Sequence, residues 1–199
     1  MSRIEKLFEE YIETCPYCRK KALVVRSIIY EIPYVGKALL FSKKCYHCGY
    51  SHADILPLEI REPIRIRFKV KKEDDLCVKI IRSPFATIRV PELGVDMTPG
   101  PLAPMFYTNV EGLLERLEDL GETFKALALS EEDKRRAEKY LERVKKIKSE
   151  LDFTIEIEDP YGLSTIIVLD EDQKRRLSIE KSGDVDVETK EEGERKGKR

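Results

Sequence analysis

The amino-acid sequence predicts a mainly β protein with an inserted helical hairpin. Two Cys-x-x-Cys pairs lie near the start, strand-like alternation flanks the centre of the chain, and two amphipathic helical patterns lie between those strands. At 199 residues and 41% hydrophobic content, the chain can bury a core, as one large domain or as a small module attached to a medium-sized one. We expect an N-terminal module over 1–52, a β-roll over 53–170 and a charged, disordered tail over 171–199.

The charge balance excludes a protein that binds nucleic acid through a global basic field. Charged residues make up 38% of the chain, but 38 acids and 37 bases leave a net charge of -1. Asn109 and Gln173 are the only amide side chains, which is typical of hyperthermophile proteins and favours an archaeal source over a charge-rich mesophile. With no apolar run of membrane-spanning length and no signal-peptide pattern, the protein is predicted to be cytoplasmic.

The first element predicted is a short amphipathic helix over residues 2–13. Ser2 and Glu5 have the spacing of a capping box, and an apolar stripe follows at helical intervals. A β-rich stretch then connects the two cysteine pairs, with Gly36 at the turn of its hairpin.

The cysteine pairs predict one structural zinc site. Two residues separate the members of each pair and 26 residues separate the pairs, so two turns can direct four thiolates at one ion. Soft thiolates favour zinc, and four of them leave no open position for a catalytic water. Disulfides or a redox pair are the alternatives, as is His47 in place of one thiolate. The predicted ligands are Cys15, Cys18, Cys45 and Cys48.

Strands are predicted next at 64–70, 76–82 and 85–90. In the first, apolar residues alternate with Arg65, Arg67 and Lys69, which is typical of a half-buried strand with a solvated basic face, and less often of a ligand face. Cys77, alone within the second, is interpreted as a small core residue. A rigid loop rich in proline and glycine follows over 94–107.

Two helices, over about 108–149, form the predicted insertion. Thr108 and Glu111 have capping-box spacing, and the apolar face of the first helix stops before Gly121. Ser130 and Asp133 are positioned to cap the second helix. Strand patterns return after it, and a turn at residues 159–162 is predicted to join them as a hairpin.

Catalysis is not expected. The only histidines are His47 and His52, both in or beside the cysteine module, so the β-roll has none with which to hold a catalytic metal. The sequence also lacks the nucleophile-elbow and phosphate-binding loop motifs. We therefore interpret the chain as a binding protein without a small-molecule substrate.

The finger ending at residues 45–50 resembles that of the ZPR-type zinc-finger proteins. Later segments strengthen the resemblance: 75–83 leading to Pro-Glu-Leu at 91–93, Thr-Pro-Gly-Pro at 98–101, the helix start at 108–114, and Asp-Pro-Tyr-Gly-Leu-Ser at 159–164. The likeness covers about residues 14–170. Departures occur at Met105-Phe106, where a glycine is expected, and at Asn109, which replaces a threonine.

This resemblance implies a zinc ribbon followed by one double-stranded β-helix, or jelly-roll-like, domain with an inserted helical hairpin. Eukaryotic members carry two copies of this unit, bind translation elongation factor one-alpha and assist its folding. The resemblance therefore implies an adaptor or chaperone for a translational GTPase. The family motifs give these candidate partner contacts: Thr98, Pro99, Gly100, Thr108, Glu111, Asp159, Gly162 and Ser164. A purely structural role in turns and a helix cap is the alternative for them.

The alternative function is RNA binding by the zinc ribbon. Basic residues gather near aromatic rings in this module, a combination suited to phosphates and stacked bases. They are Arg19, Lys20, Lys21, Lys43 and Lys44, with Tyr17, Tyr30, Tyr34 and Tyr46. Such clusters are also common on solvated surfaces.

Overall fold

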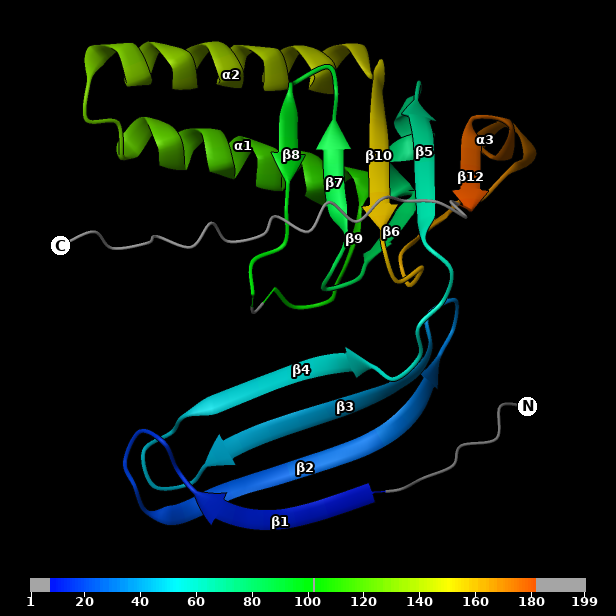
Figure 1. The fold of residues 1–199 in the computed structure, drawn as a ribbon. Helices are drawn as coiled ribbons and strands as arrows, with labels where there is room; N and C mark the ends of the chain where they lie inside the picture. The colour runs from blue at the N-terminus through cyan, green and yellow to red at the C-terminus, as the bar shows by residue number, and fades with distance from the viewer. Residues whose placement is uncertain (1–7, 102, 182–199) are drawn as a thin grey trace, which may run out of the picture.

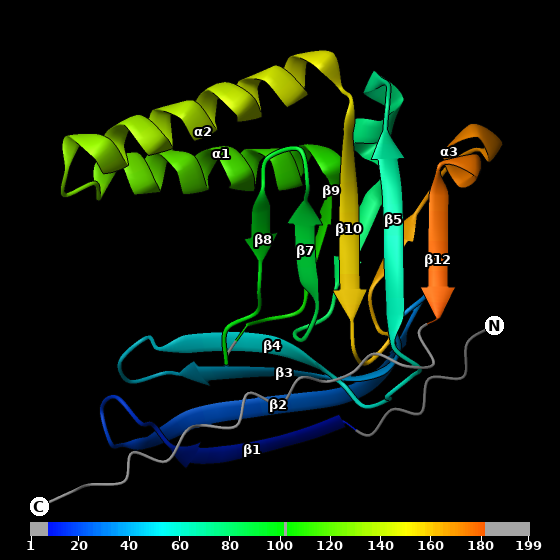
Figure 2. The same cartoon turned by 45° about the horizontal axis from the view of Figure 1, so that its top comes forward.

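The computed structural model describes residues 8–101 and 103–181, and it arranges them in two β bodies (Figure 1). The first body is one antiparallel sheet in chain order, β1-β2-β3-β4. The second contains a five-stranded sheet, β12-β5-β10-β7-β8, and a three-stranded sheet, β11-β6-β9. In both ribbon views the four-stranded sheet lies below the second body, and helices α1 and α2 lie across the opposite end (Figures 1 and 2).

The first body consists of β1 (Phe8–Thr14), β2 (Lys21–Ile32), β3 (Gly36–Cys45) and β4 (Ser51–Pro57). The prediction of a helix over 2–13 is wrong for residues 8–13, because β1 pairs with β2 from Phe8 opposite Ile28 onward. Residues 1–7 lie outside the described part. Every residue of β1 is exposed, so the helical stripe has no core to pack on, and sheet pairing prevails over local propensity. The sheet also continues through β4, past the expected boundary at 52.

The jelly-roll body begins with β5 (Ile64–Val70), a 3₁₀-helix η1 (Glu73–Cys77) and β6 (Lys79–Arg82). Cys77 lies in η1 and is exposed, which corrects its interpretation as a core residue. The remaining elements follow in this order: β7 (Thr87–Val90), β8 (Val95–Met97), β9 (Phe106–Asn109), α1 (Val110–Ala126), α2 (Glu131–Glu150), β10 (Phe153–Asp159), β11 (Thr165–Ile167), α3 (Glu171–Arg175) and β12 (Leu177–Lys181).

One hydrophobic core unites the two sheets of this body with the helices. Alternate residues of β5 and β10, among them Phe68 and Phe153, are fully buried, and they join Leu113 and Leu117 of α1 and Val144 of α2 in the same cluster. Alternation along the strands and the three-to-four-residue spacing along the helices direct these side chains inward. The hairpin therefore completes the core rather than standing apart from it.

The ends of the two helices are specified by local side-chain contacts. Ser130 caps α2 as predicted, because its Oγ accepts a hydrogen bond from the amide of Asp133 at 3.1 Å. At α1 the cap is Asn109 instead of Thr108, and its Oδ1 accepts from the amide of Gly112 at 2.9 Å. Gly121 does not end α1. It lies inside the helix, where a Cβ atom would come within 2.6 Å of Leu141, so glycine permits close packing of the two helices.

The strands around residues 159–162 do not form the predicted hairpin. The turn itself exists, with the amide of Gly162 donating to the carbonyl of Asp159 at 3.3 Å. However, β10 pairs with β5 and β7, whereas β11 pairs with β6 in the other sheet. The turn thus carries the chain between sheets, as jelly-roll topology requires.

The prediction of a disordered tail is wrong for residues 171–181, which form α3 and the edge strand β12. Asp75, fully buried, binds Arg176 through two hydrogen bonds of 2.6 and 2.9 Å and accepts a third from Gln173 at 3.2 Å. Burial raises the pKa of Asp75, but Arg176 and the amides of Lys71 and Lys72 outweigh it and hold that pKa below its usual value. The rest of the predicted tail, 182–199, lies outside the described residues.

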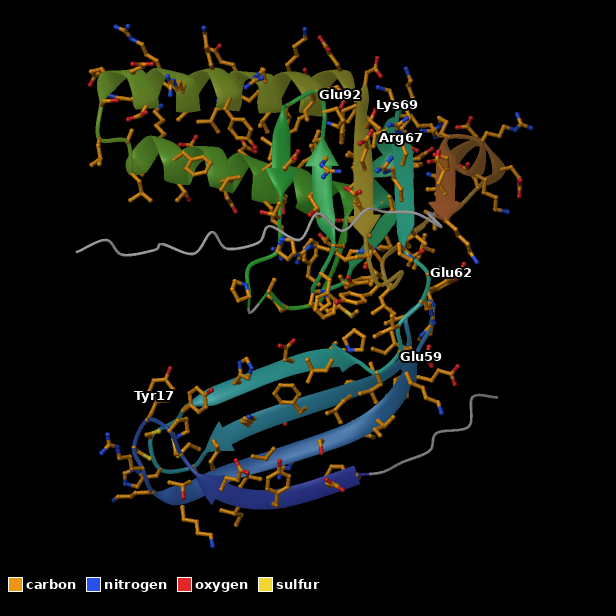
Figure 3. The ribbon with its side chains drawn as sticks, viewed as in Figure 1. Tyr17, Glu59, Glu62, Arg67, Lys69 and Glu92 are labelled. Atoms are coloured by element: carbon orange, nitrogen blue, oxygen red, sulfur yellow. The ribbon has the colours of Figure 1, made fainter. Side chains whose placement is uncertain are left out.

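The basic residues of β5 face carboxylates on neighbouring segments. Arg67 pairs with Glu156 at 2.7 Å, and Lys69 contacts Glu92 at 3.2 Å; Arg67, Lys69 and Glu92 are labelled in Figure 3. Arg65 pairs with Glu158 at 3.2 Å. These pairs, two of them between neighbouring strands, neutralise the basic face of β5. None of the helices in the described segments is long and apolar enough to cross a membrane.

Candidate metal centre

Two matching turns hold the cysteines at one end of the four-stranded sheet. In the first, the carbonyl of Cys15 accepts a hydrogen bond from the amide of Arg19 at 2.9 Å. In the second, the carbonyl of Cys45 accepts from the amide of Gly49 at 3.0 Å. The donor residue has a left-handed backbone in both, with φ of 57° at Arg19 and 77° at Gly49. The two pairs are therefore copies of one local structure on neighbouring hairpin ends.

The four sulfur atoms converge. Sγ of Cys15 lies 3.7 Å from Sγ of Cys48, Sγ of Cys18 lies 3.7 Å from Sγ of Cys45, and all four lie within 4.8 Å of one another. A tetrahedral zinc ion with Zn–S bonds of about 2.3 Å separates its sulfurs by about 3.8 Å. Disulfides require about 2.05 Å, so these distances rule out that alternative. His47 is exposed and is not part of the cluster.

The electrostatics of the cluster favour a bound cation. Burial raises the pKa of Cys45, but the amides of Cys48 and His47 and the neighbouring sulfurs outweigh it and lower that pKa to about 7. The amide of Tyr50 acts to lower the pKa of Cys48, but burial and the other three sulfurs raise it to about 12. Ionising one sulfur thus opposes ionisation of the next, and a divalent ion relieves that repulsion. Four thiolates complete the shell, so this is a structural zinc site.

The zinc site also organises the small core of its module. Leu23 and Val25 of β2 are buried against Cys15 and Cys45, with Ala22 and Tyr50 packed at the margin. The ring of Tyr17, which Figure 3 shows at the cysteine end of the sheet, lies 4.6 Å from that of Tyr50. Few other side chains are buried in β1 to β4, so the ion carries much of the module's cohesion.

The predicted partner contacts fall into exposed and buried groups. Thr98, Gly100 and Glu111 are exposed, whereas Pro99 and Thr108 are half-buried. Asp159, Gly162 and Ser164 are buried.

The buried group shapes the turn between β10 and β11. Asp159 Oδ2 accepts hydrogen bonds from the amides of Leu163 and Ser164 and from Ser164 Oγ, at 2.6 to 3.0 Å. Gly162 has φ of 64°, and a Cβ there would approach the Glu62 carbonyl to 2.2 Å. The Asp159 and Ser164 side chains therefore bond within the fold, and Tyr161 presents the accessible side chain of this turn.

Comparison with known proteins matches both bodies in the same order. The model of the ZPR1 zinc-finger domain matches residues 9–59, and that of the ZPR1 jelly-roll domain matches residues 74–192. An uncharacterized ZPR1-like protein of Methanocaldococcus jannaschii is 41% identical over 155 residues, or 77% of this chain and 78% of its own. Another from Pyrococcus horikoshii is 38% identical over 170 residues, or 82% and 75%.

Eukaryotic relatives are more distant. The zinc finger chaperone of Schizosaccharomyces pombe is 32% identical over 111 residues, which is 53% of this chain but 23% of that protein. These relatives are named as ZPR1-like proteins or as a chaperone, and none of these names is that of an enzyme. Because a zinc finger and a jelly-roll domain of one family follow each other along most of the chain, the protein belongs to the ZPR1 family.

Proposed function

We propose that this protein is a zinc-dependent adaptor or chaperone for a translational GTPase of the elongation factor one-alpha type, acting in the cytoplasm without catalysis. Family membership supports the chaperone class, since the Schizosaccharomyces pombe relative is named a zinc finger chaperone. The choice of a GTPase follows the motif resemblance at residues 98–101, 108–114 and 159–164. The proposal of no catalysis is supported by the sequence, whose only histidines, His47 and His52, lie in the zinc module.

The observation that carries the proposal is an apolar row across one face of the zinc-module sheet, with an exposed phenylalanine at its edge strand. Phe8 is opposite Ile28, Ile28 opposite Leu40, and Leu40 opposite Ile55, so the four side chains share one face. Phe8 is 59% exposed, and the other three are half-buried. Contiguous exposed apolar surface is typical of protein interaction sites.

A second apolar surface lies at the connection between α1 and α2. Phe124 is 57% exposed, Leu127 70% and Leu129 99%, and they border a hollow of about 470 Å³ that also reaches Tyr140. A client that contacts both surfaces would bridge the two bodies of the molecule. This arrangement supports a protein partner over a small ligand, because the apolar surface is divided between separate regions.

The test is binding of the full, zinc-loaded chain to a purified archaeal GTPase of this type in nucleotide-free, GDP and GTP states. We expect a complex in at least one state, and a higher refolding yield of the denatured GTPase when the chain is present. Phe8→Glu should weaken both effects, whereas Leu56→Glu, at a position 45% exposed on the opposite face of the sheet, should not. No binding in any state, together with an unchanged refolding yield, would contradict the proposal.

RNA remains the second candidate because of the zinc end of the sheet. Tyr17 and Tyr46 are 74% and 64% exposed there, and the ammonium of Lys44 lies 5.6 Å from the ring of Tyr46. Stacking rings beside lysines suit single-stranded RNA. Binding of an oligouridine that weakens steeply with salt would favour this function, and no binding at low salt would eliminate it.

A further inference from the structure

A buried arginine without a carboxylate partner lies at the end of β6. Arg82 is 6% exposed, and its Nε donates to the carbonyl of Ala86 at 2.9 Å while Nη1 donates to that of Pro104 at 3.4 Å. Within the described residues no carboxylate forms an ion pair with it. Buried charges in proteins are ordinarily paired, so this guanidinium requires an explanation.

A second arginine without an ion pair shares the same aromatic ring. The guanidinium of Arg82 lies 5.2 Å from the centre of the Phe106 ring, and that of Arg116, on α1, lies 4.7 Å from it. Arg116 likewise makes no ion pair with any described residue. Burial first and then the charge of Arg116 lower the pKa of Arg82, and Asp159 opposes them from a distance. Two like charges thus lie against one aromatic ring, and Asp159 is the carboxylate that influences Arg82.

That carboxylate is already engaged. Asp159 accepts from the amides of Tyr161, Leu163 and Ser164 and from the Ser164 hydroxyl, so its oxygens serve the turn. The remaining nitrogen of Arg82, Nη2, has no hydrogen-bond partner in the described residues and is not completely shielded from solvent, because Arg176 Nε is the one fully buried unpaired side-chain atom there. Nη2 is therefore the Arg82 donor that remains for an oxyanion.

Two accessible aromatic rings lie near Arg82. Arg82 is bonded to the turn that carries Phe85, and the ring of Phe85 lies 4.5 Å from that of Tyr161 in an edge-on contact. Phe85 is 47% exposed and Tyr161 36%. Arginines bordered by exposed aromatic rings are the composition of a protein-binding surface, where a charged group and an apolar side chain of one segment are bound together.

We propose that Arg82 and Arg116 bind an acidic segment of a partner polypeptide through its carboxylates, while Phe85 and Tyr161 contact an apolar side chain of the same segment. The inference rests on the proposed function only in taking the partner to be a protein. The class follows from charge complementarity, because two guanidinium groups without an ion pair match the carboxylates of an acidic segment. RNA fits less well, since it needs many phosphate contacts, and the arginines of the basic face of β5, Arg65 and Arg67, are paired with Glu158 and Glu156.

The test is fluorescence anisotropy of the full, zinc-loaded chain at low salt, with a labelled peptide of repeated Glu-Phe-Gly as the probe. The matched peptide replaces every Glu by Gln. We expect the Glu peptide to bind at least about tenfold more tightly, because its carboxylates make charge-assisted hydrogen bonds. Arg116→Gln should weaken binding of the Glu peptide about tenfold. Arg135→Gln, which removes an exposed arginine of α2 that has no ion pair, should leave it unchanged.

Four results would overturn the inference. The first is equal binding of the Glu and Gln peptides, and the second is an equal loss of Glu-peptide binding in Arg135→Gln and Arg116→Gln. The third is displacement of the Glu peptide by inorganic phosphate at equal concentration. The fourth is binding of oligouridine that depends on Arg116 and is tighter than binding of the Glu peptide. The last two would assign the surface to a small oxyanion and to RNA, respectively. Failure of the proposed function is a separate outcome: the GTPase would then not bind, while the Glu peptide would still discriminate between Arg116→Gln and Arg135→Gln.

Discussion

The zinc module and the jelly-roll body are held together by different forces. Among the described residues, the zinc module buries a cluster of four, two of which are the cysteines Cys15 and Cys45. The jelly-roll cluster contains 20 buried residues drawn from both sheets and from α1 and α2. A metal that joins two turns replaces the apolar burial that so small a sheet cannot supply. The zinc module can therefore leave much of its apolar surface free for a partner.

The largest expected effect is loss of the metal. Cys45→Ser removes a fully buried sulfur from the centre of the cluster, and structural zinc contributes about 10 kcal/mol or more to folding of comparable modules. We expect zinc content to fall well below one ion per chain, with proteolytic cleavage confined to β1 to β4. The matched control is Cys77→Ser, at the exposed cysteine outside the cluster, which should keep its zinc. Full zinc content in Cys45→Ser would contradict the ligand assignment.

A core truncation in the jelly-roll body should show the opposite pattern. Phe153 is fully buried in β10, so Phe153→Ala should lower the free energy of unfolding by about 3–5 kcal/mol without changing the zinc content. Phe8→Ala, at an exposed phenylalanine of the zinc module, should change it by less than about 0.5 kcal/mol. Chemical denaturation with parallel metal analysis checks both. Loss of zinc in Phe153→Ala would show that the two bodies are not independent.

The ion pair between Asp75 and Arg176 joins the end of the described chain to the jelly-roll body. Asp75→Asn should cost about 2–3 kcal/mol, because it leaves the mostly buried Arg176 with only the exposed Asp172 as an ion-pair partner. Asp74→Asn, at the exposed neighbour, is the control. Hydrogen exchange should locate the loss in β12 and α3, and uniform protection across both variants would contradict this role.

The same pair gives a pH dependence. The folded-state pKa of Asp75 is lowered, so its contribution is complete above the pKa of an unfolded aspartate, about 3.9, and is lost as the pH falls through the lower folded value. Between pH 5 and pH 2 the wild-type chain should therefore lose more stability than Asp75→Asn does. Parallel losses in the two proteins, measured by urea denaturation, would show that Asp75 is not the group responsible.

The smallest expected effect distinguishes the two cysteine turns from each other. Arg19 occupies a left-handed backbone position that Gly49 occupies in the other turn. Arg19→Gly should relieve that strain and stabilise the zinc-bound module by up to about 1 kcal/mol, whereas Gly49→Ala should destabilise it by a similar amount. The concentration of chelator needed to remove half the zinc measures both changes. Shifts in the same direction would contradict the equivalence of the turns.

The features predicted correctly from the sequence are those encoded at short range. The four-cysteine site follows from two identical spacings, the Ser130 cap follows from a residue and its neighbour three positions on, and the family motifs indicate the jelly roll.

The errors in the sequence-based predictions concern long-range contacts. Phe8–Thr14 has helical periodicity but pairs with β2, and residues 171–181 look like a tail because their anchor, Asp75, lies 101 positions before Arg176. The group of Arg82, Phe106 and Arg116 comes from three separate segments and has no sequence signature.

Hydrogen–deuterium exchange of the full chain, with and without a strong chelator, tests most directly whether the metal holds one body and the hydrophobic core the other. After metal analysis shows that zinc is removed, amides of β2 and β3 should lose their protection, while those of β5 and β10 should keep it. Retained protection in β2 and β3 without zinc would contradict the account. So would simultaneous loss of protection in both bodies.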